Sequence, residues 1–447
     1  MDHTSFQDLD IWGPDSFRAS LLKKLDFTVT SGGLLALRSR MRHPFTDAGP
    51  IAATQGTLRL LSPLYAWWAA QFSERQLRYV EKYISSRITP FAYHNPWRAQ
   101  LQAASFRRKY KQDWYFLHTA ILHFCSLLQK LQALFAQFPE IPVPLQHLQQ
   151  LLQALQDPGG IVAHLDPKKD RTYSTPRIVF LDSFFRRHHK SDCRELVDAF
   201  FDLDALFSMA YAQEKWAFQA PEISTTETRI AFEGLYHPLL PAATANDFCF
   251  QKGEHLLFLT GPNMAGKSTF LKAVGLAVYL AHLGMGVPAA AARMPVFDAI
   301  FVNINISDDI AGGNSYFQSE INRINEMAVV LQHSERALVI VDELFRGTNM
   351  EDAVDCAALV IEKLKAWPAS CFLVSSHFKV LADRLAGTSA IRFMRFPATI
   401  VGGQPVFTYR LEEGVSAVRL GKTLLLNAGT LSKLQAVTTI NTSGESP

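Results

Sequence analysis

A chain of 447 residues is long enough for two or three domains, and its 48% hydrophobic and 19% charged residues indicate a globular protein with sizeable cores. A net charge of +3 does not by itself imply a nucleic-acid partner, so any basic surface has to be local. The five cysteines are scattered without CxxC spacing, which argues against a disulfide framework and predicts reduced thiols in a cytoplasmic protein. No signal peptide is recognised, and the longest apolar region, 273–292, is interrupted by His282, so no membrane span is predicted.

Residues 1 to about 225 are predicted to be almost entirely helical, because apolar residues recur there every three or four positions. In the longest of these segments Leu127, Leu131, Leu134 and Phe138 are four, three and four residues apart. The expected helices span about 16–26, 31–43, 57–71, 74–87, 113–138 and 191–215.

A narrower leucine seam follows, formed by Leu145, Leu148, Leu152 and Leu155. Such a seam suits one partner helix, either inside the same helical domain or in an intermolecular coiled coil, and packing within the domain is favoured. The segment 160–177 is polar and basic and is predicted to be an exposed loop or hairpin. The basic cluster 186–190 is either a solvated face or a set of phosphate contacts.

From about residue 222 the pattern changes to short apolar runs that alternate with helical segments. This βαβ alternation predicts a largely parallel sheet flanked by helices. The fold class is therefore an all-α domain, 1–225, followed by an α/β domain, 226–437, with a disordered polar tail at 438–447. Strands are expected at 228–233, 248–251, 255–260, 299–304, 337–342 and 371–376, and helices at 267–283, 315–332, 351–366 and 378–385.

The apolar run Leu256–Leu259 leads into a phosphate-binding loop pattern, Gly261-x-x-x-x-Gly266-Lys267-Ser268. The glycines allow the backbone N–H groups to face a pyrophosphate, and Lys267 reaches the outer phosphates. Ser268 offers a hydroxyl to Mg²⁺, and the following helix directs its positive N-terminus at the anion. The sequence therefore predicts a nucleoside triphosphate site formed by Gly261, Pro262, Asn263, Met264, Ala265, Gly266, Lys267, Ser268 and Thr269.

Two further apolar strands end in residues suited to nucleotide hydrolysis. The strand 337–342 ends in Asp342 and Glu343, which are expected to hold the Mg²⁺ shell and to polarise the attacking water. The strand 371–376 is followed by His377. Because the carboxyl ends of parallel strands meet at one edge of a sheet, His377 is predicted to sense the γ-phosphate, the alternative being a capping or core histidine.

The stretch 308–320 runs through two glycines into a helix that is expected to be capped by Ser315. Its N-terminus is a second anion-binding device, and one nucleotide does not need two from the same chain. The simplest explanation is a homodimer in which this helix faces the ATP of the partner.

The order of these motifs resembles the MutS family of DNA mismatch-repair ATPases, a branch of the ABC-type ATPases. The similarity includes the Pro-Asn-Met insertion in the phosphate loop, Val287-Pro-Ala, Asp342-Glu-Leu-Phe-Arg-Gly-Thr and Ser376-His-Phe. It implies that Ser315, Phe317 and Glu320 belong to the signature helix acting in trans. Upstream, Thr28-x-Thr30-x-x-Gly33 and Asp204 look like the ends of the family's helical core and lever domain.

Several departures from the family pattern bear on function. The mismatch-reading wedge domain and the connector are expected to be missing, the DNA-gripping clamp is at best reduced to about 140–190, and no nuclease module is expected after the ATPase. Phe345 stands where the family usually has glycine. Ala243 occupies a position where relatives often stack an aromatic ring on adenine, which leaves Tyr409 as the candidate stacking residue.

The sequence thus predicts a Mg²⁺-dependent ATPase whose hydrolysis moves the levers on mismatched or otherwise distorted double-stranded DNA. The DNA-contacting residues are not identified by the sequence. Two alternatives remain, a binder of branched or junction DNA in recombination and an ATP-driven protein-interaction switch that touches no DNA. No membrane partner is expected.

Overall fold

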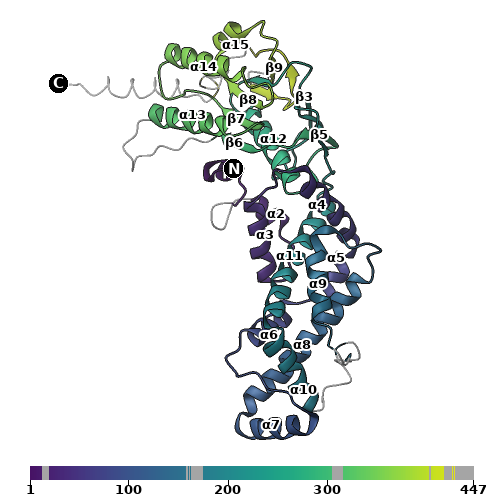
Figure 1. Cartoon of the computed structure of the whole chain (residues 1–447). Helices are drawn as coiled ribbons and strands as arrows, with labels where there is room; N and C mark the ends of the chain where they lie inside the picture. The colour runs from purple at the N-terminus through teal and green to yellow at the C-terminus, as the bar shows by residue number, and fades with distance from the viewer. Residues whose placement is uncertain are drawn as a thin grey trace, which may run out of the picture.

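The computed structural model describes residues 1–12, 20–157, 160, 162, 175–304, 316–401, 404–416, 425 and 427. Within these residues the molecule is elongated, with an α/β part at one end and a long stalk of helices extending from it (Figure 1). The fold class expected from the sequence is confirmed, since helices precede a mixed α/β region. None of the helices in the described ranges is long and apolar enough to cross a membrane.

The stalk is built from helices that run mostly along its length and pack around α11 (Figure 1). Its last helix ends at Lys215, and the first strand of the α/β part begins at Glu222. The elements before that strand are α1 (His3–Asp8), α2 (Leu21–Leu25), α3 (Ser31–Arg42), α4 (Ala48–Leu61), η1 (Ser62–Leu64), α5 (Tyr65–Gln71), α6 (Glu74–Ile84), α7 (Pro96–Lys109), α8 (Lys111–Phe135), η2 (Val143–Leu145), α9 (Gln146–Ala154), α10 (Thr175–Asp182), the π-helix η3 (Ser183–His188) and α11 (Lys190–Lys215).

Buried polar side chains hold the stalk helices in register. Asp204 on α11 is fully buried and accepts hydrogen bonds from the backbone N–H groups of Val29 and Thr30 and from the indole of Trp68. The Thr30 hydroxyl donates to the same carboxylate and caps α3. Thr30 and Asp204, which lie 174 residues apart in the sequence, therefore meet at the junction of α3 and α11.

The leucine seam packs inside this stalk, because Leu148 and Leu152 of α9 are buried and the helix lies on α11. The described part of 140–190 thus contributes α9, α10 and η3 to the helical domain. The residues of the basic cluster 186–190 differ in their exposure to solvent. Arg186 is 3% exposed and forms a bidentate pair with the fully buried Asp182, so it is not available for phosphate contacts, whereas Arg187, His188 and Lys190 remain exposed.

The α/β part contains a six-stranded sheet in the order β12-β9-β4-β8-β7-β6, parallel except for β12. A four-stranded sheet, β1-β5-β2-β3, and the hairpin β10-β11 lie beside it. Its elements are β1 (Glu222–Ser224), β2 (Ala231–Leu235), β3 (Asn246–Cys249), β4 (Leu256–Thr260), α12 (Lys267–His282), β5 (Ala291–Pro295), β6 (Ala299–Asn303), α13 (Tyr316–Gln332), β7 (Ala337–Asp342), α14 (Met350–Leu364), β8 (Cys371–Ser376), α15 (Lys379–Leu385), β9 (Ile391–Arg395), β10 (Ala398–Val401), β11 (Gln404–Phe407) and β12 (Glu412–Glu413).

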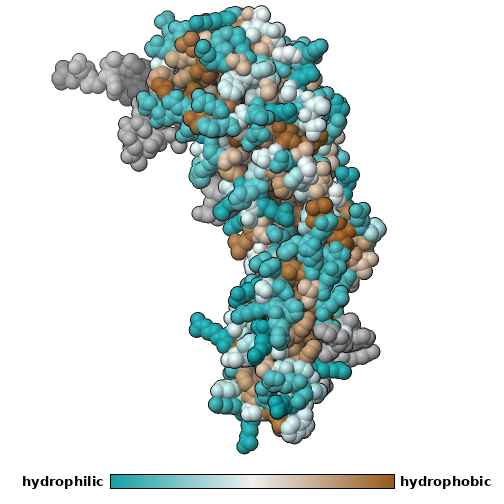
Figure 2. All heavy atoms as spheres, in the orientation of Figure 1, coloured by the Kyte–Doolittle hydropathy of each residue, from teal (hydrophilic) through white to brown (hydrophobic). Residues whose placement is uncertain are grey.

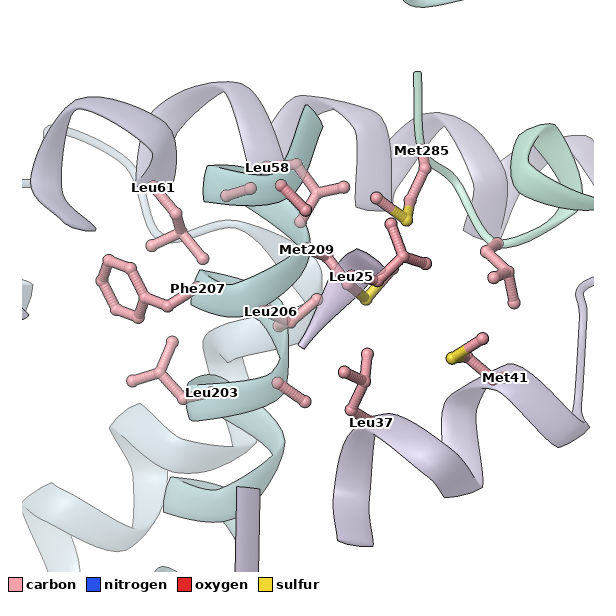
Figure 3. Close-up of a cluster of buried hydrophobic side chains, with 14 of the residues drawn as sticks. Leu25, Leu37, Met41, Leu58, Leu61, Leu203, Leu206, Phe207, Met209 and Met285 are labelled. Atoms are coloured by element: carbon pink, nitrogen blue, oxygen red, sulfur yellow. The ribbon is translucent and has the colours of Figure 1, made fainter. Parts of the chain in front are cut away.

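Alternate residues of the central strands serve two different cores. On β4, Leu257 and Leu259 belong to the core that includes α12 and the stalk, whereas Leu256 and Phe258 face the core formed with α13, α14 and α15. Both faces of the sheet are covered, which is why these strands read as continuous apolar runs in the sequence. The core that includes α12 continues from the α/β part into the stalk. At this junction Met285 lies beside stalk residues such as Met41 and Leu58 (Figure 3).

The far end of α12 is bonded to the stalk. The ring of His282 is almost fully buried, and its Nδ1 and Nε2 lie 2.7 Å from the carbonyl oxygen of Phe45 and 3.3 Å from the amide nitrogen of Phe297. The Tyr279 hydroxyl donates to the carbonyl of Met41. The helix that begins at the phosphate loop is thus fixed at its other end to the last turn of α3 and to the segment between α3 and α4.

The first helix does not pack with the stalk, although the sequence places it in the helical domain. α1 lies along β6, the edge strand of the large sheet, and Ser5 and Asp8 accept hydrogen bonds from the amides of Val302 and Ile304. Arg323 of α13 binds Asp2 from the other side. α1 therefore covers an edge that would otherwise present unpaired backbone groups.

Candidate nucleotide site

A cleft of about 630 Å³ lies where β4 and β7 end, between the large sheet and the loop that follows β2. Its walls contain both the phosphate-loop residues and the acids that follow β7. Gly261 and Ala265 do not line it and serve the backbone of the loop instead. The lining residues are Leu235, Tyr236, His237, Leu240, Ala242, Ala243, Thr244, Asn246, Pro262, Asn263, Met264, Gly266, Lys267, Ser268, Thr269, Phe270, Ala273, Ile304, Asp342, Glu343, Arg346, Phe396 and Tyr409.

The loop after β4 has the backbone geometry that its glycines predict. Gly266 is the N-cap of α12 with φ of 107°, a region that L-residues rarely adopt. A Cβ on Gly261 would lie 2.9 Å from the carbonyl oxygen of Phe396 on the neighbouring chain segment. α12 starts directly after the loop, so its N-terminal amides and positive dipole end face the cleft.

Lys267 is 4% exposed, and its ammonium group is held by the loop itself. Nζ donates to the carbonyl oxygens of Gly261 and Pro262 at 2.9 and 3.4 Å. It also lies 3.6 Å from Oε1 of Glu343. A buried ammonium with carbonyl partners next to empty cleft volume is well placed to receive an anion.

Ser268 and Asp342 come from different elements and meet directly. The Ser268 hydroxyl donates to Oδ2 of Asp342, and the Ser375 hydroxyl donates to Oδ1 of the same carboxylate. Ser375 lies opposite Asp342 in the β7–β8 ladder, so the strand register sets this contact. A hydroxyl and a carboxylate are oxygen ligands of the type that Mg²⁺ takes alongside waters and phosphates. The pair therefore fits the magnesium role expected from the sequence.

Glu343 is surrounded by three cationic or titratable groups. Its Oε2 lies 2.9 Å from Nε of Arg346 and 3.7 Å from Nδ1 of His377, and its Oε1 faces Lys267. The pKa of His377 is lowered by partial burial, which the nearby carboxylate opposes and the two cations reinforce. Neutral imidazole is therefore the favoured form at neutral pH. His377 is not among the residues that line the cleft, and it contacts the site through the carboxylate of Glu343.

The loop that follows Glu343 has an unusual backbone. Glu343 and Phe345 have φ of 59° and 60°, and the left-handed conformation costs about 1–2 kcal/mol for an L-residue. Phe345 is the residue for which the resemblance predicts a glycine in the family. Its ring is buried and lies 5.8 Å from the ring of Phe317, measured between centroids.

Glu320 is buried within its own chain, and its expected role in trans stays a prediction. Its carboxylate is 2% exposed and accepts hydrogen bonds from the amides of Arg346 and Gly347 at 2.7 and 3.1 Å. Phe317, three residues earlier, packs on Phe345. The reason is that α13 lies against the end of β7, so one face of the helix is occupied by the loop after Glu343. Ser315 lies outside the described residues.

The other end of the cleft is formed by small apolar residues and by Tyr409. Tyr409 has φ of 55° and is 46% exposed, and its carbonyl oxygen accepts a hydrogen bond from the side chain of Asn246. Asn246 also accepts from the amide of Leu411, which fixes the loop that presents the ring. His237 forms part of the same wall, and burial lowers its pKa to about 4, an effect that Lys272 reinforces and Asp10 opposes.

Three contributors to this site were not predicted from the sequence. Ser375 orients Asp342, Asn246 anchors the Tyr409 loop, and Asp10 binds Lys272 of α12 at 2.7 Å. A serine two residues before His377 on a buried strand was the one available signal for Ser375, because a polar side chain in such a run needs a partner. No local pattern marks Asn246 or Asp10.

Comparison with known proteins assigns the α/β part to a family. Residues 257–434 match the family model described as MutS domain V. These residues form a MutS domain V. Such a domain is an ABC-type ATPase, and it contributes the phosphate loop, the acids after β7 and Tyr409 to the cleft, whereas the wall formed by 235–246 precedes the matched residues.

Curated MutS proteins are similar to this chain over about half of its length or less. The chain is 33% identical over 235 residues to the DNA mismatch repair protein MutS of Thermotoga maritima, which covers 52% of this chain and 29% of that protein. It is 38% identical over 187 residues to MutS of Pelotomaculum thermopropionicum, or 40% and 21% of the two chains. MutS of a Geobacillus species is 31% identical over 219 residues, or 48% and 25%. The chain therefore spans less than a third of the length of these curated relatives.

Proposed function

We propose that this protein binds and hydrolyses ATP in the cleft of its MutS domain V and uses the cycle to move the helical stalk. The observation that carries the proposal is the convergence of Lys267 and Ser268, at the start of α12, with Asp342 and Glu343, at the end of β7, on one cleft. Lys267 and the loop amides would hold the phosphates, and Ser268 and Asp342 would hold Mg²⁺, which neutralises phosphate charge when bound. Tyr409 would stack on the base.

Glu343 would orient and polarise the attacking water, with neutral His377 beside it as the sensor of the γ-phosphate. Arg346 and Lys267 now bind the Glu343 carboxylate, and both are cations that phosphate oxygens would attract. ATP would therefore compete for these partners and leave Glu343 available to water. Stalk movement would follow from the bonds that join α12 to the last turn of α3 and to the segment between α3 and α4.

The first test measures ATP binding and phosphate release by the purified full chain with and without Mg²⁺. Glu343→Gln should keep ATP affinity and lower turnover by roughly 100-fold or more, the usual contribution of a positioned general base. Glu362→Gln, on the exposed surface of α14, is the matched control and should behave as the unmodified protein. Normal turnover by Glu343→Gln would contradict the water-orienting role.

We propose DNA as the partner held by the stalk, because its far end carries a local basic surface. α7 and the start of α8 expose Arg98, Arg107, Arg108, Lys109 and Lys111 together with the aromatic rings of Trp97 and Tyr115. Hydrophilic side chains project from this end of the molecule (Figure 2). Cations beside exposed rings suit a phosphate backbone and its bases. The small net charge of the whole chain is consistent with a surface of this local kind.

The DNA proposal is tested by titrating perfect duplex, single-mismatch duplex and a four-way junction over several salt concentrations, with and without ATP. Arg107→Ala/Arg108→Ala should weaken binding and reduce its salt dependence, whereas Arg59→Ala/Lys252→Ala removes the same charge from other exposed sites and should not. Preference for the junction would move the function to branched DNA. No binding at low salt would leave an ATP-driven protein-interaction switch.

A homodimer through the ATPase part completes the proposal, with the segment around Ser315 facing the nucleotide of the partner. Because ATP would contribute contacts to both subunits, it should promote self-association of Glu343→Gln, which retains the nucleotide. Sedimentation velocity with and without ATP measures this. An unchanged sedimentation coefficient over micromolar concentrations would contradict it.

A further inference from the structure

Phe345 adopts a backbone conformation that glycine would adopt without strain, yet it carries a large buried ring. With φ of 60° it lies in the left-handed region, and its side chain is 5% exposed. A strained residue persists where its surroundings hold it. Here the surroundings include Phe317 of α13, whose ring is tilted by 51° against that of Phe345 at 5.8 Å. Packing to α13 thus compensates for the strain of the backbone.

The same helix also binds the backbone of the loop. Glu320 is one turn beyond Phe317, and both of its carboxylate oxygens accept amide hydrogen bonds from the loop, at Arg346 and Gly347. A buried carboxylate that loses these donors would be left unpaired, which is costly. The loop 343–347 is therefore attached to α13 twice, once through two rings and once through two hydrogen bonds.

This attachment fixes Arg346 in front of Glu343. The Arg346 side chain binds Glu343 through Nε at 2.9 Å and donates from Nη2 to the carbonyl oxygen of Asp342 at 3.0 Å. With Lys267 3.6 Å from the other carboxylate oxygen, Glu343 has a cation on each side of its carboxylate. We call this the resting arrangement of Glu343.

We propose that Phe345 is a positioning residue that latches the loop 343–347 to α13 through Phe317 and thereby holds Glu343 in the resting arrangement. A shift of α13 would release Phe345 and Arg346 together, and Glu343 would become free to act on water once the phosphates of ATP also take Lys267. The inference rests on the proposed role of Glu343 in hydrolysis. It makes α13 the element that determines when that carboxylate is active.

The variants that test the latch leave the loop itself unchanged where possible. Phe317→Ala removes the ring contact from the α13 side, and Phe317→Leu keeps an apolar contact of similar size. Ile324→Ala removes a half-buried apolar side chain from the same helix about two turns away, and it controls for general loosening of α13. Phe345→Gly relieves the strained φ and removes the ring together.

The first readout needs no nucleotide. Hydrogen–deuterium exchange of the peptide that contains Arg346 and Gly347 should accelerate at least tenfold in Phe317→Ala and much less in Phe317→Leu or Ile324→Ala, because opening of the loop exposes the amides that Glu320 protects. Unchanged exchange in Phe317→Ala would overturn the latch, whatever the protein does with ATP.

The second readout is steady-state ATP hydrolysis. Phe317→Ala and Phe345→Gly should raise the rate at saturating ATP by at least threefold with unchanged KM, and Phe317→Leu should restore the original rate. Faster exchange without faster hydrolysis, or a fall in rate that tracks a lower melting temperature, would overturn the control of Glu343. If the unmodified protein binds ATP but shows no turnover, the proposed function fails, and the exchange result still decides the latch.

Discussion

The two halves of the molecule use buried polar groups for different purposes. In the stalk, Asp204 and the Asp182–Arg186 pair have their partners within the protein, and they fix which helix lies against which. In the α/β part, Ser268 bonds Asp342, and Lys267 contacts loop carbonyls and Glu343, but these groups lie at the wall of an open cleft. Buried groups with complete partners specify a fold, whereas groups whose partners can be exchanged for a ligand make a site.

The contrast predicts opposite outcomes for removing a buried cation in each half. Arg186→Ala leaves the carboxylate of Asp182 buried without its guanidinium, and we expect a loss of about 3–5 kcal/mol in the free energy of unfolding. Calorimetry measures the loss, and ATP binding should persist in the folded protein. Arg187→Ala removes the adjacent, exposed charge and should have little effect. Equal effects of the two variants would contradict the structural role of Arg186.

In the α/β part, removal of the buried cation should lower the affinity for ATP and not the stability of the fold. Lys267→Ala removes the buried ammonium that faces the cleft, and we expect ATP affinity to fall by about 2–5 kcal/mol, or roughly 30-fold or more. The melting temperature without nucleotide should change little, because the partners of Lys267 are loop carbonyls next to the open cleft and Glu343, which keeps Arg346 as a second cation. Isothermal titration calorimetry tests this against Lys252→Ala, an exposed lysine elsewhere on the same part. An unchanged ATP affinity in Lys267→Ala would contradict a role for Lys267 in ATP binding.

His237 provides a smaller, pH-dependent test of the cleft wall. Its pKa is about 4 in the folded protein against an ordinary value of 6.5, so the unfolded chain binds the proton more readily between these values. Stability is therefore complete above about pH 6.5 and falls as the pH drops toward 4, by at most about 3 kcal/mol from this group. His237→Asn should flatten that decline in urea titrations, and His333→Asn, at an exposed site, should not.

The smallest effect is expected on the surface of the α/β part. Arg384 of α15 pairs with Asp355 of α14, and both side chains are at least half exposed. Exposed ion pairs contribute about 0–1 kcal/mol because water and salt screen them. Arg384→Gln should therefore change neither the unfolding free energy beyond that range nor ATP turnover. A large loss of turnover would mean that α14 and α15 transmit more to the cleft than their contacts suggest.

Much of the site was predictable because its parts are local. A buried strand followed by the glycine-rich loop, and a second one ending in Asp342 and Glu343, are recognised from short runs of sequence. Both are consequences of backbone requirements and of burial on two faces. The helical stalk was likewise predicted from spacing alone. α7, β5 and the strands after β8 were missed, since their apolar residues are too few or too irregular to show a period.

The sequence by itself determined the element types, the phosphate loop and the acids at the strand ends. The tertiary structure alone decided which of these groups meet. It placed Ser375 on Asp342 through strand register, turned Glu320 toward its own chain, and docked α1 on the sheet edge, where Asp8 and Ile304 are 296 residues apart in the sequence. The physical reason is that conformation and burial follow from a residue's neighbours in the chain, whereas the partner of a buried polar group depends on how distant segments pack.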